Sequence, residues 1–148
     1  MMSKDQAPFK IAIADSNAAI AGCFPVMRQL RTHFEDESEF VAQVKRQQEQ
    51  GFRMAYLETD GSVRAVAGYR FLESLFAGRF LYVDDLVTDA NERSLGYGGA
   101  LLDWLVAEAR AAGCRKLELD SGVQRFAAHR FYLLKRMSIS SHHFTLEL

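Results

Sequence analysis

Residues 86–102 read LVTDANERSLGYGGALL, and this stretch decides the fold. It follows directly on an apolar segment, residues 80–87, that is typical of a buried strand. A polar loop comes next, and Gly96, Gly98 and Gly99 then open a helix whose apolar residues recur at helical spacing. Because three glycines in four residues disfavour a helix nucleus, they indicate a role other than folding.

The start of this helix is suited to binding phosphate. Glycines leave the N–H groups of the first turn unobstructed, and these unpaired donors, together with the positive end of the helix dipole, attract an anion. Arg93 lies a few residues upstream and adds a planar cation for the same anion. The stretch therefore predicts a site for a pyrophosphate group.

Other interpretations of the glycines fit less well. A P-loop requires Lys-Ser or Lys-Thr after its glycines, and neither follows here. A dinucleotide fingerprint requires G-x-G-x-x-G directly after the strand, whereas Leu101 stands at the third glycine position and the loop is long. Asp120 ends the next predicted strand where such a fold has its acid, so a nucleotide-binding oxidoreductase stays open. An ordinary helix start with flexible glycines also stays open.

The same residues resemble motif A of the GCN5-related N-acetyltransferase (GNAT) superfamily, whose signature is Arg/Gln-x-x-Gly-x-Gly/Ala. Arg93, Gly96 and Gly98 match that signature. Residues 128–132 resemble the later family segment A-x-x-F/L-Y, whose tyrosine, here Tyr132, is often the general acid. The resemblance covers roughly the C-terminal two-thirds of the chain. One departure is Arg136-Met137, which replaces the Gly-Phe pair usual after that helix.

This resemblance implies roles for individual residues. Main-chain groups of Leu86, Val87 and Thr88 would pair with the pantetheine arm of acetyl-CoA, and an N–H near Leu86 or Val87 would polarise the thioester oxygen. Tyr132 would protonate the departing thiolate, because its unperturbed pKa of about 10 lies near that of an alkyl thiol. The residues predicted to surround the pyrophosphate are Arg93, Ser94, Leu95, Gly96, Tyr97, Gly98 and Gly99.

The general base is left open between two aspartates. Asp84 and Asp85 are consecutive on the predicted strand, so alternation directs only one of them to the cleft unless a bulge intervenes. Either could act through a water molecule. Glu118 and His129 are further candidates. The predicted catalytic set is thus Tyr132, Asp85 and Asp84, with no metal.

Composition limits the partners and the compartment. A chain of 148 residues with 49% hydrophobic residues predicts a single domain, 1–148, and a net charge of −1 favours neither nucleic acid nor a membrane surface. No apolar run approaches the ~20 residues of a membrane span, and no secretory signal is recognisable. Cys23 and Cys114 are isolated, which predicts core thiols in the cytoplasm. Adjacent His142 and His143 would point to opposite strand faces and hold no shared metal.

The periodicities predict an α/β protein. Strands are expected at residues 9–14, 53–58, 63–72, 79–88, 117–120 and 142–147, with 137–139 as a short further strand. Helices are expected at 20–30, where Pro25 should kink the helix or start a new segment, and at 38–50, 98–112 and 125–136. This order predicts one mixed, mostly antiparallel sheet with helices on both faces, in agreement with the GNAT fold. A partner chain could complete the sheet in a homodimer.

We therefore expect an acetyl-CoA-dependent N-acetyltransferase that acts by direct attack of a primary amine in a ternary complex. The acceptor would be a small molecule or a peptide, selected by the first two helices and their loops. Charged residues of both signs occur there: Arg28, Arg31, His33, Glu35, Asp36 and Glu37. The alternative is a CoA-binding sensor or regulatory module without catalysis, which the departure at Arg136-Met137 and the unassigned base motivate.

Overall fold

The computed structural model describes residues 8–93 and 95–148 of the chain. By its internal contacts the chain divides into two units, Met1–Glu118 and Leu119–Leu148, which are described separately below. The expectation of a single domain stays a prediction.

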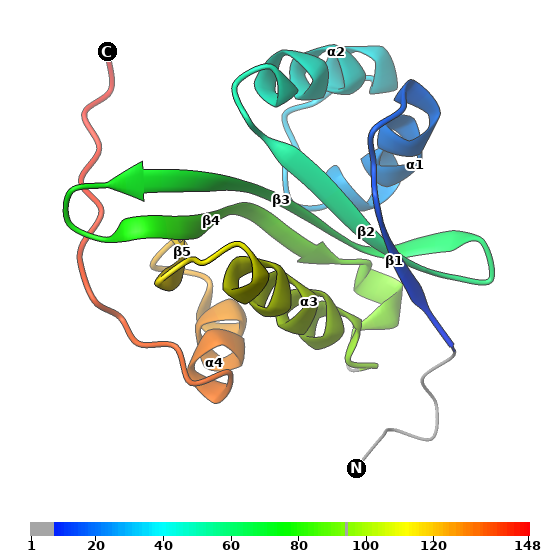
Figure 1. The fold of residues 1–148 in the computed structure, drawn as a ribbon. Coiled ribbons are helices and arrows are strands. Elements are labelled where there is room, and N and C mark those ends of the chain that lie inside the picture. Colours follow the sequence, from blue (N-terminus) through cyan, green and yellow to red (C-terminus); the bar gives the residue numbers. More distant parts are fainter. Residues whose placement is uncertain (1–7, 94) are drawn as a thin grey trace. The chain divides into compact units, whose positions relative to one another are not determined.

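A five-stranded sheet runs through the described residues in the order β1-β2-β3-β4-β5 (Figure 1). Its strands are β1 (Lys10–Ile13), β2 (Arg53–Thr59), β3 (Ser62–Ser74), β4 (Gly78–Thr88) and β5 (Lys116–Leu119). The first four pair antiparallel with their neighbours. The last two are joined through helix α3 (Tyr97–Ala111), and Arg115 N donates to Arg79 O (2.8 Å) where both strands begin, so β5 runs parallel to β4. The predicted mixed sheet is confirmed.

Local sequence explains the turns and caps around this sheet. The β2–β3 hairpin turns through Asp60 and Gly61, both with positive φ, as a two-residue hairpin loop requires. Helix α1 (Asn17–Met27) begins at its N-cap Ser16, whose Oγ accepts from Ala19 N at 3.1 Å. Gly113, with φ +75°, follows the end of α3 as a left-handed cap. These signals were readable in the sequence.

Helices cover both faces of the sheet within Met1–Glu118. In Figure 1, α1 and α2 (Glu37–Gln48) lie on one side of the sheet and α3 lies on the other. Val66 of β3 belongs to the core that α1 and α2 share with the sheet. Tyr69, on the opposite face of β3, packs edge-to-face on Trp104 of α3 with ring centroids 6.0 Å apart. The predicted two-sided arrangement is thus confirmed.

Helix α1 begins and ends three residues earlier than the expected helix 20–30, and it decides one of the two alternatives at Pro25. The assigned helix passes through Pro25 and ends two residues later at Met27, so Pro25 does not start a new segment. A proline lacks the N–H that would bond to the carbonyl four residues earlier, and near a C-terminus this costs the helix a single bond. None of the described helices combines the length and the apolar character needed to cross a membrane.

The unit Leu119–Leu148 contains helix α4 (Phe126–Leu134), which is shorter than the predicted helix 125–136. The predicted strands at 137–139 and 142–147 are wrong, because residues 137–148 have no regular secondary structure. The alternation that suggested a strand is real, and the side chains of Phe144 and Leu146 are 92% and 83% exposed. Alternation alone does not supply the hydrogen-bonded neighbour that a strand requires.

Candidate active site

Asp84 and Asp85 lie at a β-bulge in the middle of β4. Gly68 of β3 is paired with Asp85 and Tyr69 with Val83, so Asp84 is the extra residue on the bulged strand. A bulge re-aims side chains and breaks the strict alternation of a strand. Both aspartates consequently line one pocket of about 230 Å³ beneath α1 and α2. The sequence left this open, because alternation alone would have directed only one of them there.

Gly68 of β3 makes room for the carboxylate of Asp85. A Cβ added at Gly68 would collide with Asp85 Oδ2 and with the ring of Phe52. The sequence analysis missed Gly68, although a glycine inside a strand pattern is a recognised sign of a bulge or a close approach.

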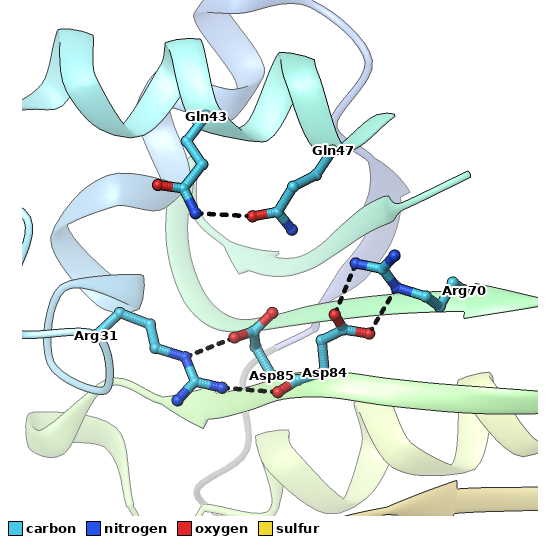
Figure 2. Close-up of polar contacts among 6 residues, drawn as sticks. All are labelled: Arg31, Gln43, Gln47, Arg70, Asp84 and Asp85. Carbon is cyan, nitrogen blue, oxygen red and sulfur yellow. Dashed lines mark hydrogen bonds and ion pairs between the residues drawn. The ribbon is translucent and has the colours of Figure 1, made fainter. Parts of the chain in front are cut away.

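Two arginines bind the two aspartates in different ways (Figure 2). Arg31, from the connection between α1 and α2, donates from Nε to Asp85 Oδ1 and from Nη2 to the main-chain oxygen of Asp84, both at 2.7 Å. Arg70 of β3 binds both side-chain oxygens of Asp84, at 3.0 and 2.8 Å. Asp84 therefore has both oxygens engaged, whereas Asp85 Oδ2 has no hydrogen-bond donor among the described residues.

The two carboxylates are largely withdrawn from water. The Asp85 side chain is 13% exposed and that of Asp84 is 22% exposed. Burial raises the pKa of Asp85 above its ordinary range, and the hydrogen bond and charge of Arg31 oppose this shift without cancelling it. A carboxylate with a raised pKa accepts a proton more readily than an ordinary aspartate, which suits Asp85 to the part of a base.

The wall of the pocket opposite Asp85 is formed by two amides of α2. Gln43 Nε2 donates to Gln47 Oε1 at 3.0 Å. Figure 2 shows the free oxygen of Asp85 turned towards these two side chains. Arg31 and His33, which the sequence analysis placed among the acceptor-selecting residues, also line the pocket, but Arg28, Glu35, Asp36 and Glu37 do not.

The end of β4 has one paired edge and one edge that β5 does not reach. Leu86, Val87 and Thr88 pair on one side with residues 67, 66 and 65 of β3. Strand β5 has four residues and enters the sheet beside Arg79, so at about 3.3 Å per residue it stops well before Leu86. Within the described part of Met1–Glu118, the second edge of residues 86–88 is therefore open to another extended chain.

The loop after β4 is held from two sides. Gln29, just beyond α1, accepts from Ala90 N at 2.8 Å and donates to Asp89 Oδ1 at 3.2 Å. Arg64 of β3 forms an ion pair of 3.1 Å with Glu92 in the short 3₁₀ helix η1 (Ala90–Glu92). Arg93 comes next, is exposed, and has no ion pair with any residue that the structure describes. Ser94, also predicted to bind the cofactor, lies outside the described residues.

No side chain of the described residues caps the first turn of α3. Gly96 is the N-cap residue, with φ +84°, and offers no side chain to the N–H groups that follow. A Cβ added at Gly98 would lie 2.7 Å from Thr88 Oγ1, so the helix start approaches the end of β4 closely. The Tyr97 side chain is buried, which limits its part to its main chain, and Leu95 is half-buried. Free main-chain donors beside crowded glycines suit a diphosphate.

In the unit Leu119–Leu148, Tyr132 of α4 lines a pocket of about 380 Å³. Burial raises the pKa of Tyr132, and Arg125 acts in the opposite direction without cancelling that effect. The ring of His129 in the same pocket lies 2.8 Å from the Gly122 carbonyl oxygen, a contact that fixes its orientation. Glu118, half-buried in β5, does not line the pocket of Asp84 and Asp85. Among the described residues, no three His, Cys, Asp or Glu side chains group as metal ligands.

Comparison with known proteins identifies the family. The model of the Acetyltransferase (GNAT) family matches residues 18–137. The chain belongs to the GNAT family. The Uncharacterized N-acetyltransferase YhdJ of Bacillus subtilis is 38% identical over 112 residues, which cover 76% of this chain and 79% of that protein. The predicted family and enzyme class are confirmed, and the oxidoreductase alternative is set aside.

Two further comparisons cover a smaller region or show the fold alone. The Aminoalkylphosphonate N-acetyltransferase of Salmonella typhimurium is 38% identical over 66 residues, which cover 45% of this GNAT chain and 43% of that protein. The crystal structure of an acetyltransferase from Trypanosoma brucei superimposes with a TM-score of 0.78 at 18% identity, covering 95% of this chain and 100% of that one. The fold predicted from the sequence is therefore confirmed.

Proposed function

We propose that this GNAT enzyme transfers the acetyl group of acetyl-CoA to a primary amine by direct attack in a ternary complex. One observation carries the proposal. A single strand, β4, holds a withdrawn carboxylate at Asp85, then a strand end with an open edge, and leads through an anchored loop to a helix start with free main-chain donors. Acyl transfer from a thioester needs these three functions close together in space.

The residues after Asp85 would hold acetyl-CoA. Its pantetheine arm would add to the open edge of residues 86–88 as an extended chain adds to a sheet. An N–H near Leu86 or Val87 would then donate to the thioester oxygen and stabilise its developing charge. The diphosphate would accept from main-chain N–H groups between Gly96 and Gly99, with Arg93 as the cation. Acetyl-CoA supplies the activated acetyl group in this reaction.

Asp85 is the proposed base. Its Oδ2 is free of described donors, whereas both oxygens of Asp84 are bound to Arg70. In the reaction Asp85 would accept a proton from the acceptor ammonium, directly or through a water molecule. The neutral nitrogen would attack the acetyl carbon, a C–N bond would form, and the C–S bond would break. Asp84 would instead fix the bulge through Arg70.

Tyr132 is the proposed acid for the departing thiolate of CoA. Support comes from the resemblance of residues 128–132 to the family segment and from the burial that raises the pKa of Tyr132. A raised pKa keeps the phenol protonated until the thiolate forms. The second proton that leaves the amide nitrogen would restore the Tyr132 phenol, directly or through water, and Asp85 would release its proton to solvent. Release of the CoA thiol and of the acetylated amine then completes a balanced transfer.

Two measurements test this function. Acetyl-CoA at about one hundred times its dissociation constant should add ~2.7 kcal/mol to the free energy of unfolding, which for a chain of this size raises the melting temperature by roughly 5–10 °C. With a panel of primary amines, the enzyme should release free CoA thiol in step with amine acetylation. Stabilisation by acetyl-CoA without thiol release from any amine would instead support the sensor alternative.

The variant Tyr132→Phe distinguishes a role of Tyr132 as the general acid from a purely structural role. This variant should lose turnover at saturating acetyl-CoA while its dissociation constant for acetyl-CoA stays unchanged. Equal loss of turnover and cofactor affinity would mean that Tyr132 has only a structural role.

The two cysteines bear on the compartment in which the enzyme would act. Cys23 and Cys114 are both free thiols, which agrees with a reducing compartment such as the cytoplasm. The expected homodimer stays a prediction that light scattering of the purified protein would test.

A further inference from the structure

The amide pair of α2 occupies an unusual place for glutamines. Gln43 and Gln47 lie one turn apart on the helix face that also carries the buried Phe40 and Val44. Both glutamines are half-buried, and withdrawing an amide from water is costly unless hydrogen bonds replace those that it loses. Their mutual bond uses one donor and one acceptor, so the pair keeps further donors and an acceptor for a molecule in the pocket.

The charges of the two aspartates in the pocket are already matched. Asp84 is neutralised by Arg70, and Asp85 forms an ion pair with Arg31. His33 also lines the pocket, and its ring packs against the Phe34 ring with centroids 4.3 Å apart. A polyamine would need several unpaired carboxylates, and a phosphonate would need unpaired cations. Among the described residues that line the pocket, both carboxylates are paired, and His33 is the one basic side chain without an ion pair, fewer cations than a doubly charged phosphonate would need.

The size of the pocket further limits which acceptors can fit. Its volume of about 230 Å³ lies below the roughly 300–1,000 Å³ of sites that hold drug-sized ligands. The aromatic residues Phe34, Phe40 and Phe52 supply part of the wall, so polar contacts are left to the amide pair, to the sheet floor and to Arg31 and His33 of the connection between α1 and α2. An acceptor that reaches both the sheet floor and the amide pair is therefore compact.

We propose that Gln43 and Gln47 recognise the acceptor, which is a compact monoamine with a neutral hydrogen-bonding group, a carboxamide or a hydroxyl, next to its amine. This inference rests on the proposed function, because it takes Asp85 as the group that receives the amine. With the amine at Asp85 Oδ2, the neighbouring group faces the two amides across the pocket (Figure 2). Selection then depends on neutral hydrogen bonds, which a charged acceptor would not match.

A matched pair of amines tests the proposal. Glycinamide and isobutylamine have the same branched shape, but only glycinamide carries a carboxamide. The ratio of kcat/KM for glycinamide to kcat/KM for isobutylamine is measured for the wild type, for the double variant Gln43→Met/Gln47→Met and for the control Gln50→Leu. Gln50 is exposed and lies outside the pocket. Dividing the wild-type ratio by the variant ratio cancels the different basicities of the two amines.

We expect the double variant to lower the ratio roughly tenfold or more, since each neutral hydrogen bond contributes about three- to tenfold. The Gln50→Leu ratio should stay at the wild-type value. An unchanged ratio in the double variant would overturn the proposal, and so would faster acetylation of spermidine or aminomethylphosphonate than of glycinamide by the wild type. If the double variant does not fold, Gln43→Met alone gives the same comparison with a smaller expected change.

The outcomes also separate this inference from the proposed function. A wild-type enzyme that binds acetyl-CoA and acetylates no amine in the panel contradicts the function itself. A wild type that acetylates amines, with a ratio that does not respond to the glutamines, contradicts only the role of the amide pair.

Discussion

The pocket at the bulge of β4 and the glycine segment at the start of α3 are neighbours in the chain, yet they are built from different groups. The pocket consists of side chains that hold one another: Asp85 bonds to Arg31 and Asp84 to Arg70, at 2.7–3.0 Å. The glycine segment offers main-chain N–H groups and has no side chain of its own at Gly96, Gly98 and Gly99, where a Cβ at Gly98 would meet Thr88 Oγ1. The first arrangement can distinguish acceptors and tune a proton transfer, whereas the second can hold a phosphate of any carrier.

The largest effect should separate the two aspartates of the pocket. Asp85→Asn should lower kcat by roughly 10²–10⁴-fold at saturating acetyl-CoA, which is the usual contribution of a general base. Asp84→Asn should lower kcat much less and act mainly on stability, because it frees Arg70. Initial rates on one amine check both variants, and a loss in Asp84→Asn that equals or exceeds that in Asp85→Asn would reverse the assignment.

A second test concerns the glycine on which the pocket depends. Gly68→Ala should destabilise the fold by about 1–3 kcal/mol, because the new Cβ meets Asp85 and Phe52. The matched control is Gly22→Ala in α1, where nothing lies within 4 Å of the added Cβ and alanine should stabilise the helix by up to ~1 kcal/mol. Urea unfolding measures both. Equal effects at the two glycines would mean that the bulge is not packed as described.

A substitution in the glycine segment should change the affinity for acetyl-CoA and leave kcat nearly unchanged. Gly98→Ala places a Cβ against Thr88 Oγ1 and displaces the donors at the helix start, so the dissociation constant of acetyl-CoA should rise about tenfold, or ~1.4 kcal/mol. The value of kcat at saturation should be nearly unchanged, since Asp85 is unaffected. Calorimetric titration gives the constant, and wild-type affinity in the variant would remove Gly98 from the site.

The smallest expected effect is a shift in pH dependence. Burial raises the pKa of Asp85, so kcat should fall on the acid side at a higher pH than an exposed aspartate would give. Arg31 lowers the pKa of Asp85, and Arg31→Gln should therefore move this acid limb further towards neutral pH. Arg70→Gln should move it less, because Arg70 is the weaker influence on Asp85. Identical acid limbs in all three enzymes would exclude Asp85 as the titrating base.

The difference between the side-chain pocket and the main-chain glycine segment also explains which features could be predicted from the sequence. The pattern of Arg93, Gly96 and Gly98 is local, and main-chain geometry follows from such patterns directly, so the helix start and its family were recognisable. The hairpin at Asp60 and Gly61, the start of α1 at Ser16 and the end of α3 at Gly113 rest on equally local signals.

The pocket could not be predicted in the same way. Arg31 and Asp85 are 54 residues apart in the chain, and only the folded sheet brings them together. The bulge that turns both aspartates to one side depends on the register with β3, which alternation does not reveal. The wrong terminal strand has a related cause, since the alternation of Phe144 and Leu146 says nothing about a pairing partner.

The central claim is that main-chain N–H groups at the start of α3 hold the diphosphate of acetyl-CoA. The most direct measurement is a titration of ¹⁵N-labelled protein with CoA, following the backbone amide resonances of the glycines. The amide resonances of Gly98 and Gly99 should shift most, while those of Gly22 and Gly61 stay in place. Binding that leaves Gly98 and Gly99 unmoved and shifts amides elsewhere would contradict this claim.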